Sequence, residues 1–335
     1  MNTVPAITAA FLRAGAHLVS SGGGRALLIL TYHRVLPGPD ALLPDQPEAL
    51  EFAAHLDLLK SVFHVLPLAE ACERMKKRSL PPRAVSITFD DGYANNLQVA
   101  APLLRARNLP ATVFVAPGFL DGGRMFNDTV IEVLRRAPAS FDMTDLGLGV
   151  LQLPSDAARR AAIDGVLGAL KYRPLRERQR AVDAMAERIG VELPGNLMMT
   201  SAEVRDLARF EIAVGAHTIN HPILTQVDAA TAEREIGESR TRLEAIVGER
   251  VDAFAYPNGR PGRDYDATHV AMVRAAGYRC AVTTAWGRAD ADCDPLQLPR
   301  IAPWDRSALG FALRMLRACV QRGEQVRPAA AAVAA

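Results

Sequence analysis

The sequence lacks paired cysteines. Its four cysteines lie far apart in the chain, and no two of them are spaced as Cys-x-x-Cys; they are Cys72, Cys280, Cys293 and Cys319. A disulfide-stapled scaffold or a zinc site made of thiolates needs such pairs, so neither is expected. The chain is therefore compatible with a reducing compartment.

A strong charge of either sign is also absent. The 39 lysines and arginines nearly balance the 37 aspartates and glutamates, which leaves a formal net charge of +2. Because a nucleic-acid-binding face needs a dense basic patch, no nucleic-acid partner is expected. The basic stretch YRPLRERQR at 172–180 is a local exception. It fits either the solvated face of a helix or a site for an anionic ligand, and the solvated face is the primary interpretation.

Long apolar runs are missing as well. No window approaches the roughly 18 apolar residues of a membrane-spanning helix. The N-terminal stretch has no basic start, and Arg13 and His17 interrupt its apolar residues, so a signal peptide is not expected. Residues 6–20 can form an amphipathic helix that packs on the domain or rests on a membrane surface. We predict a helical or flexible segment at 1–25, and a location in the cytoplasm or at the periphery of the inner membrane.

Apolar runs and amphipathic stretches alternate along most of the chain. Runs that predict buried strands occur at 26–35, 64–68, 84–89, 110–117, 210–217, 251–257, 278–284 and 296–301. Most are separated by stretches with helical spacing of apolar residues, such as 48–62 and 228–248. This alternation predicts the α/β class with a parallel sheet. Seven to eight strands favour a (β/α) barrel, a fold whose chemistry sits at the carboxyl ends of the strands.

Residues 124–200 interrupt this alternation. No strand is expected there, because helical stretches follow one another at 127–137, 155–170 and 176–190. We therefore predict a helical insertion at about 124–200. Insertions at the catalytic face of a barrel often shape specificity. The residues that open this one are accordingly candidates to touch a ligand; they are Phe126, Asn127 and Asp128.

The alternation resumes after the insertion. A helix is expected at 201–209, since Thr200 or Ser201 followed by acidic residues matches a capping box. We predict one barrel domain at 26–322 that contains the insertion. The Ala-rich tail at 323–335 is expected to be disordered.

Two polar motifs follow predicted strands. VSITFDDGYANN places the adjacent Asp90 and Asp91 between an apolar strand and Gly92, and GAHTINHP places His217 and His221 four residues apart on a turn. Two histidines and one carboxylate can hold a metal ion that keeps positions open for water and substrate. The second carboxylate can then act as a general base. Taken singly, the aspartates also fit a helix N-cap and the histidines an unrelated pair.

A third motif, FAYPNGRPG at 254–262, follows another predicted strand. Pro257 and Gly259 shape a tight loop that can bring a backbone N–H to a developing oxyanion, although a plain turn fits the same residues. Together, TFDDG, HTxxHP and FAYPNG resemble the polysaccharide deacetylase family, also called the NodB-homology family or carbohydrate esterase family 4. The resemblance covers Thr31 to Trp304 apart from the insertion.

The resemblance implies a distorted (β/α) barrel and the metal-dependent hydrolysis of an N-acetyl group on an amino sugar, which releases acetate. By motif match, Asp91, His217 and His221 would bind a divalent metal, zinc in the first place and cobalt, nickel or iron(II) as alternatives. Asp90 would be the general base for the attacking water. The backbone N–H of Asn258 would help to stabilise the oxyanion.

Two residues of the family pattern are absent from their usual positions in this sequence. The third motif usually carries an arginine that holds the base, and Ala255 stands in its place. Arg300 in LPRI, at a late strand end, is the candidate replacement, with a structural role as the alternative. The late histidine that usually acts as general acid is missing from LPRIAPW. His33 in LTYHRV is the candidate acid, with substrate binding or a structural role as alternatives, and YHRV resembles the exopolysaccharide-associated members.

The predicted function is a metal-dependent deacetylase of N-acetylhexosamine units on a bacterial exopolysaccharide or its lipid-linked precursor. The predicted substrate-binding residues are Tyr93, Pro257, Asn258 and Trp286. Trp286, like Trp304, can stack on a sugar ring or pack in the core. The alternatives are deacetylation of peptidoglycan or chitooligosaccharides, an O-acetyl glycan esterase, and a non-catalytic carbohydrate-binding relative. Peripheral membrane contact stays open, and no oligomeric state is predicted.

Overall fold

The computed structural model describes residues 25–305 and 307–327. Seven parallel strands form a nearly closed barrel; in spatial order they are β1 (Leu27–Tyr32), β3 (Ala84–Phe89), β4 (Ala111–Val115), β7 (Ile212–Ala216), β8 (Ala253–Ala255), β9 (Cys280–Trp286) and β10 (Leu298–Arg300). Ile301, directly after β10, exchanges backbone hydrogen bonds of 2.8 and 3.0 Å with β1, which brings the first and last strands together. A short eighth strand, β2 (His64–Val65), pairs with the start of β3. The predicted barrel of seven to eight strands is confirmed.

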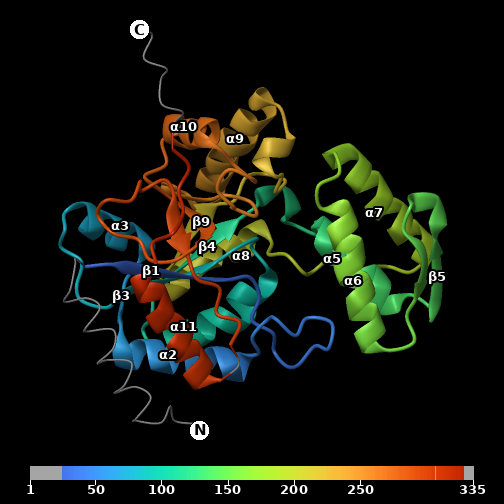
Figure 1. The fold of residues 1–335 in the computed structure, drawn as a ribbon, viewed down its shortest axis with the longest axis horizontal. Coiled ribbons are helices and arrows are strands. Elements are labelled where there is room, and N and C mark those ends of the chain that lie inside the picture. The colour runs from blue at the N-terminus through green and yellow to red at the C-terminus, as the bar shows by residue number, and fades with distance from the viewer. Residues whose placement is uncertain (1–24, 306, 328–335) are drawn as a thin grey trace.

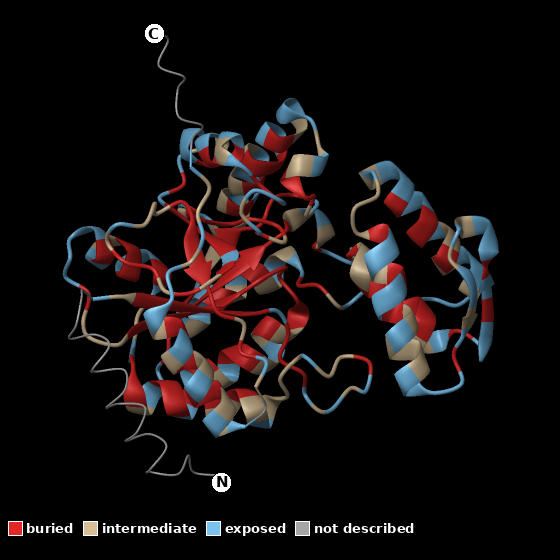
Figure 2. Cartoon of the chain, in the orientation of Figure 1, coloured by how far each residue is buried: buried red, intermediate tan, exposed pale blue. Residues whose placement is uncertain are grey.

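Helices cover the outside of the barrel, and Figure 2 shows them buried on the side that faces the strands and exposed on the other. They are α2 (Ala49–Val62), α4 (Ala101–Arg105), α8 (Ser201–Asp206), α9 (Ala229–Val247), α10 (Ala267–Ala275) and α11 (Ala308–Val320). A further helix, α3 (Leu68–Lys76), packs its buried face on side chains from the amino ends of the strands, so it covers that end of the barrel. Helix α8 begins at the expected capping box, in which Thr200 and Glu203 cap each other.

Strand β3 shows how the sequence aims side chains into the barrel. Its alternate residues Val85, Ile87 and Phe89 join the core beneath the outer helices. Thr88 points to the opposite face, where its hydroxyl accepts a hydrogen bond from the buried Arg300. Because side chains of a strand alternate, Asp90 continues the row that contains Thr88. The end of β3 therefore delivers a carboxylate to the inside of the barrel.

The segment after β4 forms a separate lobe beside the barrel (Figure 1). It contains α5 (Phe126–Arg136), α6 (Asp156–Leu170) and α7 (Leu175–Ile189), which enclose an apolar core of their own. The expectation that no strand lies between these helices is wrong, because β5 (Ser140–Met143) and β6 (Gly149–Gln152) pair as an antiparallel hairpin. Its turn contains Gly147 and Gly149 at positive φ, and only alternate residues of β5 are buried.

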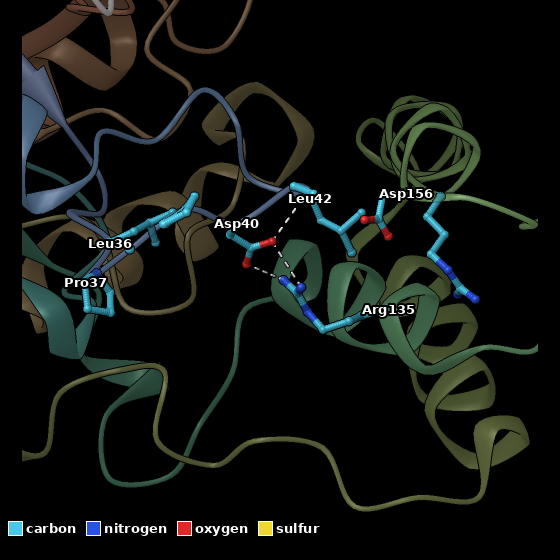
Figure 3. A pocket seen from close by; sticks show the side chains of 10 residues that line it. Leu36, Pro37, Asp40, Leu42, Arg135 and Asp156 are labelled. Carbon is cyan, nitrogen blue, oxygen red and sulfur yellow. Dashed lines mark hydrogen bonds and ion pairs between the residues drawn. The ribbon is translucent and has the colours of Figure 1, made fainter.

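The loop after β1 ties the barrel to this lobe, as Figure 3 shows. Asp40 accepts two hydrogen bonds from the Arg135 guanidinium of α5, at 2.7 and 3.1 Å. Leu42 is buried in the apolar core of the lobe. Both flank an open hollow of about 600 Å³. A bidentate ion pair of this kind fixes orientation as well as distance, so the loop holds the lobe against the barrel.

The chain ends fall largely outside the described residues. The predicted N-terminal segment at 1–25 lies outside them except for Arg25, and so does most of the predicted tail at 323–335. Within the described ranges, no helix combines the length and apolar character needed to cross a membrane. The domain boundaries proposed from the sequence stay predictions.

Candidate functional site

A cavity of about 320 Å³ lies where the carboxyl ends of the barrel strands meet the lobe. The barrel loops contribute His33, Asp90, Asp91, His217, His221, Asn258 and Thr284 to its wall. The lobe and the loop before it contribute Met125, Phe126, Asn127, Leu167, Gly168, Lys171 and Arg178. The four sequence motifs follow β1, β3, β7 and β8, and all four contribute residues to this cavity, at the end of the barrel where the chemistry of this fold sits.

Backbone conformation explains why two adjacent carboxylates face one cavity. Strand alternation alone would send Asp91 to the face opposite Asp90. Asp91 instead adopts a left-handed conformation with φ of 76°, and Gly92 follows with φ of 88°. A Cβ on Gly92 would also approach Val115 Cγ1 to 3.1 Å. Such strained positions persist where the surrounding structure holds them, and they cluster at functional sites.

Asp90 is held by Arg300 in a buried side-on ion pair. The two guanidinium Nη atoms donate to the two carboxylate oxygens, each at 2.7 Å. Arg300 also donates from Nε to the carbonyl of Thr283 at 2.9 Å and from Nη1 to the hydroxyl of Thr88 at 3.2 Å. Burial alone would raise the pKa of Asp90, but the charge of Arg300 and the proximity of His217 hold that pKa well below its usual range. Asp90 is therefore ionised at neutral pH.

Asp91, His217 and His221 converge on one point. Their candidate ligand atoms lie within 4.8 Å of one another. Asp91 Oδ1 is 3.5 Å from His217 Nε2 and 3.6 Å from His221 Nε2. That oxygen is buried and accepts no hydrogen bond within the described chain. An orphaned carboxylate oxygen that faces two imidazole nitrogens is a donor set suited to a divalent metal ion.

The protonation of the triad fits the same interpretation. His217 Nδ1 lies 2.7 Å from the carbonyl oxygen of Ala255, and since a carbonyl can only accept, Nδ1 carries a proton, which leaves Nε2 as the nitrogen that faces Asp91. Burial and the neighbouring His217 lower the pKa of His221 well below its usual value. Burial also raises the pKa of Asp91 to about 7. An Asp91 carboxyl whose pKa is raised beside two imidazole nitrogens fits a metal ion that replaces its proton.

His33 follows directly after β1 and lines the cavity. Its backbone carbonyl accepts a hydrogen bond from the Asn96 side chain at 2.8 Å, which fixes the chain at this point. Desolvation in the cavity lowers the pKa of His33, while the Asp90 carboxylate acts in the opposite direction. His33 and Asp90, the proposed base, both line the cavity. Its role as general acid stays a prediction.

The third motif forms a tight loop beside β9. Asn258 has φ of 58°, and its carbonyl accepts a hydrogen bond from the Thr284 hydroxyl at 2.5 Å. Gly259 accepts another from the Thr284 N–H at 3.0 Å, and a Cβ on Gly259 would lie 2.9 Å from that nitrogen. The N–H of Asn258 has no acceptor in residues 25–305 or 307–327. An unused donor on the cavity wall suits a developing oxyanion.

Three predicted substrate-binding residues lie away from the cavity wall. Tyr93 is buried behind it, where its hydroxyl donates to Asp128 at 3.2 Å. Trp286 is half-buried, with the Arg317 guanidinium 5.4 Å from its ring. Pro257 belongs to the third-motif loop, but only its neighbour Asn258 lines the cavity. Substrate contact by these three residues stays a prediction that the geometry does not support.

Of the three residues that open the insertion, Phe126 and Asn127 line the cavity and Asp128 does not. Sequence reasoning missed the two cations that the lobe adds to the wall, Lys171 and Arg178. For the basic stretch at 172–180 the primary interpretation is a solvated helix face, with a site for an anionic ligand as the alternative. The primary interpretation is wrong for Arg178, which is only 8% exposed and lines the cavity. Burial lowers the pKa of Arg178 to about 10, so it keeps its charge at neutral pH. Helical spacing was the available signal, since Arg178 shares the buried face of α7 with Val182 and Met185.

A second group that the sequence did not reveal lies behind the cavity. Arg34 pairs with Asp128 of α5, and its guanidinium also covers the Tyr93 ring at 4.0 Å. Burial raises the pKa of Asp128, against the effect of Arg34. This cluster joins the loop after β1, the first motif and the lobe. It supports the wall that carries Asp91.

The sequence model of the polysaccharide deacetylase family matches residues 77–140 and 179–281. The unmatched interval between them contains β5, β6 and α6 of the lobe. The chain is also similar to YxkH of Bacillus subtilis, a protein whose name places it among the polysaccharide deacetylases. The two are 21% identical over 277 residues, which is 82% of this chain and 70% of the relative.

Two solved structures have the same fold. The Streptococcus pyogenes deacetylase PplD, determined in complex with acetate, matches with a TM-score of 0.56 and 19% identity, over 84% of this chain and 93% of that one. IcaB from Ammonifex degensii matches with a TM-score of 0.56 and 19% identity, over 88% of this chain and 97% of that one. At 19% identity, the similarity to these two structures supports the fold alone.

Proposed function

Because the chain belongs to the polysaccharide deacetylase family and is a carbohydrate deacetylase, we propose that it removes N-acetyl groups from N-acetylhexosamine units of a bacterial polysaccharide or its lipid-linked precursor. One observation carries this proposal. Asp91, His217 and His221 converge in the cavity that also exposes Asp90, the carboxylate held by Arg300. These are the parts that hydrolysis of an unreactive amide requires.

Each residue has a role in the proposed reaction. Asp91, His217 and His221 would hold a divalent metal, zinc in the first place. A metal bound there would supply Lewis acidity to the acetyl carbonyl and to water. Asp90, kept ionised and oriented by Arg300, accepts a proton from the water that attacks the carbonyl carbon.

The remaining roles concern the oxyanion and the leaving group. The Asn258 N–H donates to the carbonyl oxygen as it gains negative charge. His33 gives a proton to the amine nitrogen as the C–N bond breaks. Acetate and a free amino sugar are the products, and the proton taken up by Asp90 balances the one delivered by His33. The location in the cytoplasm or at the inner membrane remains part of the proposal.

The test pairs metal content with acetate release. The chain is purified without chelator, its metal content is measured, and acetate release is followed from N-acetylglucosamine oligomers and from an acetylated ester. We expect about one metal ion per chain and chelator-sensitive acetate release that favours the amide. Asp91→Asn should lose both, whereas Asp164→Asn, at an exposed position of α6, is the matched control and should lose neither. A zinc-replete chain without bound metal would overturn the proposed site, and acetate released from the ester alone would overturn the amide substrate.

A further inference from the structure

We propose that the lobe builds an anion-binding wall into the active-site cavity, with Arg178 and Lys171 as its cations. The substrate would then be an acetamido sugar that carries a phosphate or carboxylate group beside the reacting unit. This inference rests on the proposed function for the acetamido sugar itself. It adds the chemical class of the group bound next to that sugar.

Arg178 is a buried cation without a counter-ion. Its side chain lines both the active-site cavity and an adjoining hollow of about 290 Å³. In the described part of the chain its guanidinium makes no hydrogen bond or ion pair, and its one recorded contact is the Phe126 ring at 4.1 Å. Burying an unpaired charge is costly, so a protein that keeps one usually supplies a partner. Here the partner has to come from the cavity.

Two other arginines of the lobe are paired with carboxylates within the chain. Arg188 forms a bidentate pair with Asp145, at 2.5 and 2.7 Å. Arg135 forms one with Asp40. These two arginines therefore have carboxylate partners, one from the lobe and one from the loop after β1. Arg178, the one among these three that reaches the active-site cavity, is left with five N–H donors in a fork that matches phosphate or carboxylate.

Lys171 adds a second positive charge to the same wall. It follows α6, lines the cavity, and makes no ion pair with a carboxylate in the described ranges. The nearby acid Asp264 is engaged elsewhere, since it accepts from the Arg260 N–H at 3.0 Å and faces the Tyr172 hydroxyl at 3.5 Å. Two cations without carboxylate partners make the lobe side of the cavity a place for an anion.

The position of these residues in the chain supports a role in specificity. Lys171 and Arg178 both lie between the two ranges that the family model matches. The metal triad and the base lie within those ranges. The proposed metal ligands and base thus lie in the part of the chain that the family model matches, and the two cations lie in the lobe between its two ranges. Loops and insertions placed on a rigid scaffold are where specificity is usually carried.

The activity test compares neutral and anionic substrates on the metal-loaded full chain. Acetate release is measured from neutral N-acetylglucosamine oligomers, from N-acetylglucosamine 1-phosphate, from UDP-N-acetylglucosamine and from an N-acetylated hexosaminuronic acid oligomer. We expect kcat/KM to be at least about tenfold higher for one anionic class than for neutral oligomers, the scale of one charge-assisted contact. The phosphate and carboxylate arms distinguish the two sources of the anion. Equal kcat/KM for all four substrates would overturn the proposal and leave the proposed function standing.

Variants separate a binding role from a packing role. Arg178→Met and Lys171→Met should each lower the ratio of anionic to neutral kcat/KM, and Arg178→Lys should retain part of it. Arg180→Met, at an exposed position of the same helix, should leave the ratio unchanged. Since Arg178→Met removes an uncompensated buried charge, its Tm should equal or exceed that of the wild type. A lower Tm together with an unchanged ratio would mean that Arg178 only packs on Phe126, and the proposal would fail.

A binding measurement is independent of the reaction. Inorganic phosphate and glucuronate are titrated into the metal-free full chain, and the shift in Tm is recorded. One of them should raise the Tm of the wild type and of Arg180→Met but not that of Arg178→Met. If this shift appears while no substrate releases acetate, the anion site stands and the proposed function fails. If neither anion gives a shift that depends on Arg178, the anion site fails.

Discussion

Arg300 and Asp90 are 210 residues apart in the chain and form a buried, side-on ion pair with two contacts of 2.7 Å. The position on β8 where the resemblance to the family leads one to expect this arginine carries Ala255. In this chain it comes from β10, which reaches the inside of the barrel next to Thr88. The Asp90 carboxylate therefore has its buried positive partner in this chain from β10, not from the strand of the third motif.

Breaking this pair should cost stability as well as activity. Arg300→Met leaves the Asp90 carboxylate buried without its partner, and we expect a loss of about 3–5 kcal/mol in the free energy of unfolding. The double variant Asp90→Asn/Arg300→Met should recover part of that loss, because it buries no unpaired charge. Urea unfolding of the wild type, both single variants and the double variant measures the coupling. Additive losses would contradict a direct electrostatic pair.

The same pair sets a pH dependence of stability. The pKa of Asp90 is lowered in the folded chain, so its contribution is fully present above the ordinary aspartate pKa of about 3.9. It is lost only as the pH falls below that value towards the lowered pKa of the folded state. The stability difference between wild type and Asp90→Asn should therefore stay constant from pH 8 to about pH 5. If this stability difference declined between pH 7 and pH 5, the pKa of Asp90 in the folded chain would be raised and not lowered, and the prediction would be wrong.

Metal binding should release a proton. The pKa of Asp91 is about 7 in the metal-free chain, and a metal ion needs the ionised carboxylate. Apparent zinc affinity should thus fall by about tenfold per pH unit below pH 7 and level off above it. Competition with a zinc indicator gives the affinity, and calorimetry in two buffers of different ionisation enthalpy counts the protons. A pH-independent affinity between pH 6 and pH 8 would show that Asp91 does not compete with a proton.

The sequence predicts those features of the site that depend on neighbouring residues, and it predicts less well those that depend on contacts between distant parts of the chain. The end of β3 and the alternation of its residues are local, so the inward position of Asp90 follows from the pattern. The partnership of Asp90 with Arg300 could be named as a candidate from the motif position, but only the closed barrel brings β10 next to β3. The left-handed conformation of Asp91, which turns its carboxylate into the same cavity as Asp90, is a backbone feature that residue spacing does not reveal.

The lobe was less predictable for a different reason. Its hairpin has strands of four residues each, of which only Phe141 and Met143 in β5 are buried, so the apolar signal is short. Arg178 was judged from the charge of its neighbours, although its helical position placed it on the buried face of α7. The number of charged residues in the stretch favours an exposed face, whereas the helical spacing of Arg178 with Val182 and Met185 indicates a buried one. A buried cation is an exception that composition cannot show.

His33 can be tested through the leaving group. An amide needs a proton on its departing nitrogen, whereas an ester with an acidic phenol does not. His33→Ala should lower kcat for N-acetylglucosamine oligomers by about 10²- to 10⁴-fold and the hydrolysis of nitrophenyl acetate far less. Metal content should be unchanged, which separates this variant from the ligand variants. Equal losses on both substrates would assign His33 to a role other than the general acid.

Tyr93 offers a test between substrate binding and support of the site. The Tyr93 hydroxyl donates to Asp128 at 3.2 Å and accepts from Asn127 at 3.3 Å, with the Arg34 guanidinium over its ring. Tyr93→Phe keeps the ring and removes one hydrogen bond from a buried carboxylate, so we expect about 1–3 kcal/mol of lost stability.

The kinetics of Tyr93→Phe should change little, because the hydroxyl lies behind the cavity wall and not on it. KM for the preferred substrate should stay within about twofold of the wild type, since no uniform binding interaction is removed. Asp128→Asn is the matched control, because it perturbs the same cluster from the side of α5 and should likewise lower stability at a nearly constant KM. A clear rise in KM for Tyr93→Phe at unchanged stability would instead return Tyr93 to the substrate-binding residues, and it would mean that the wall opens when substrate enters.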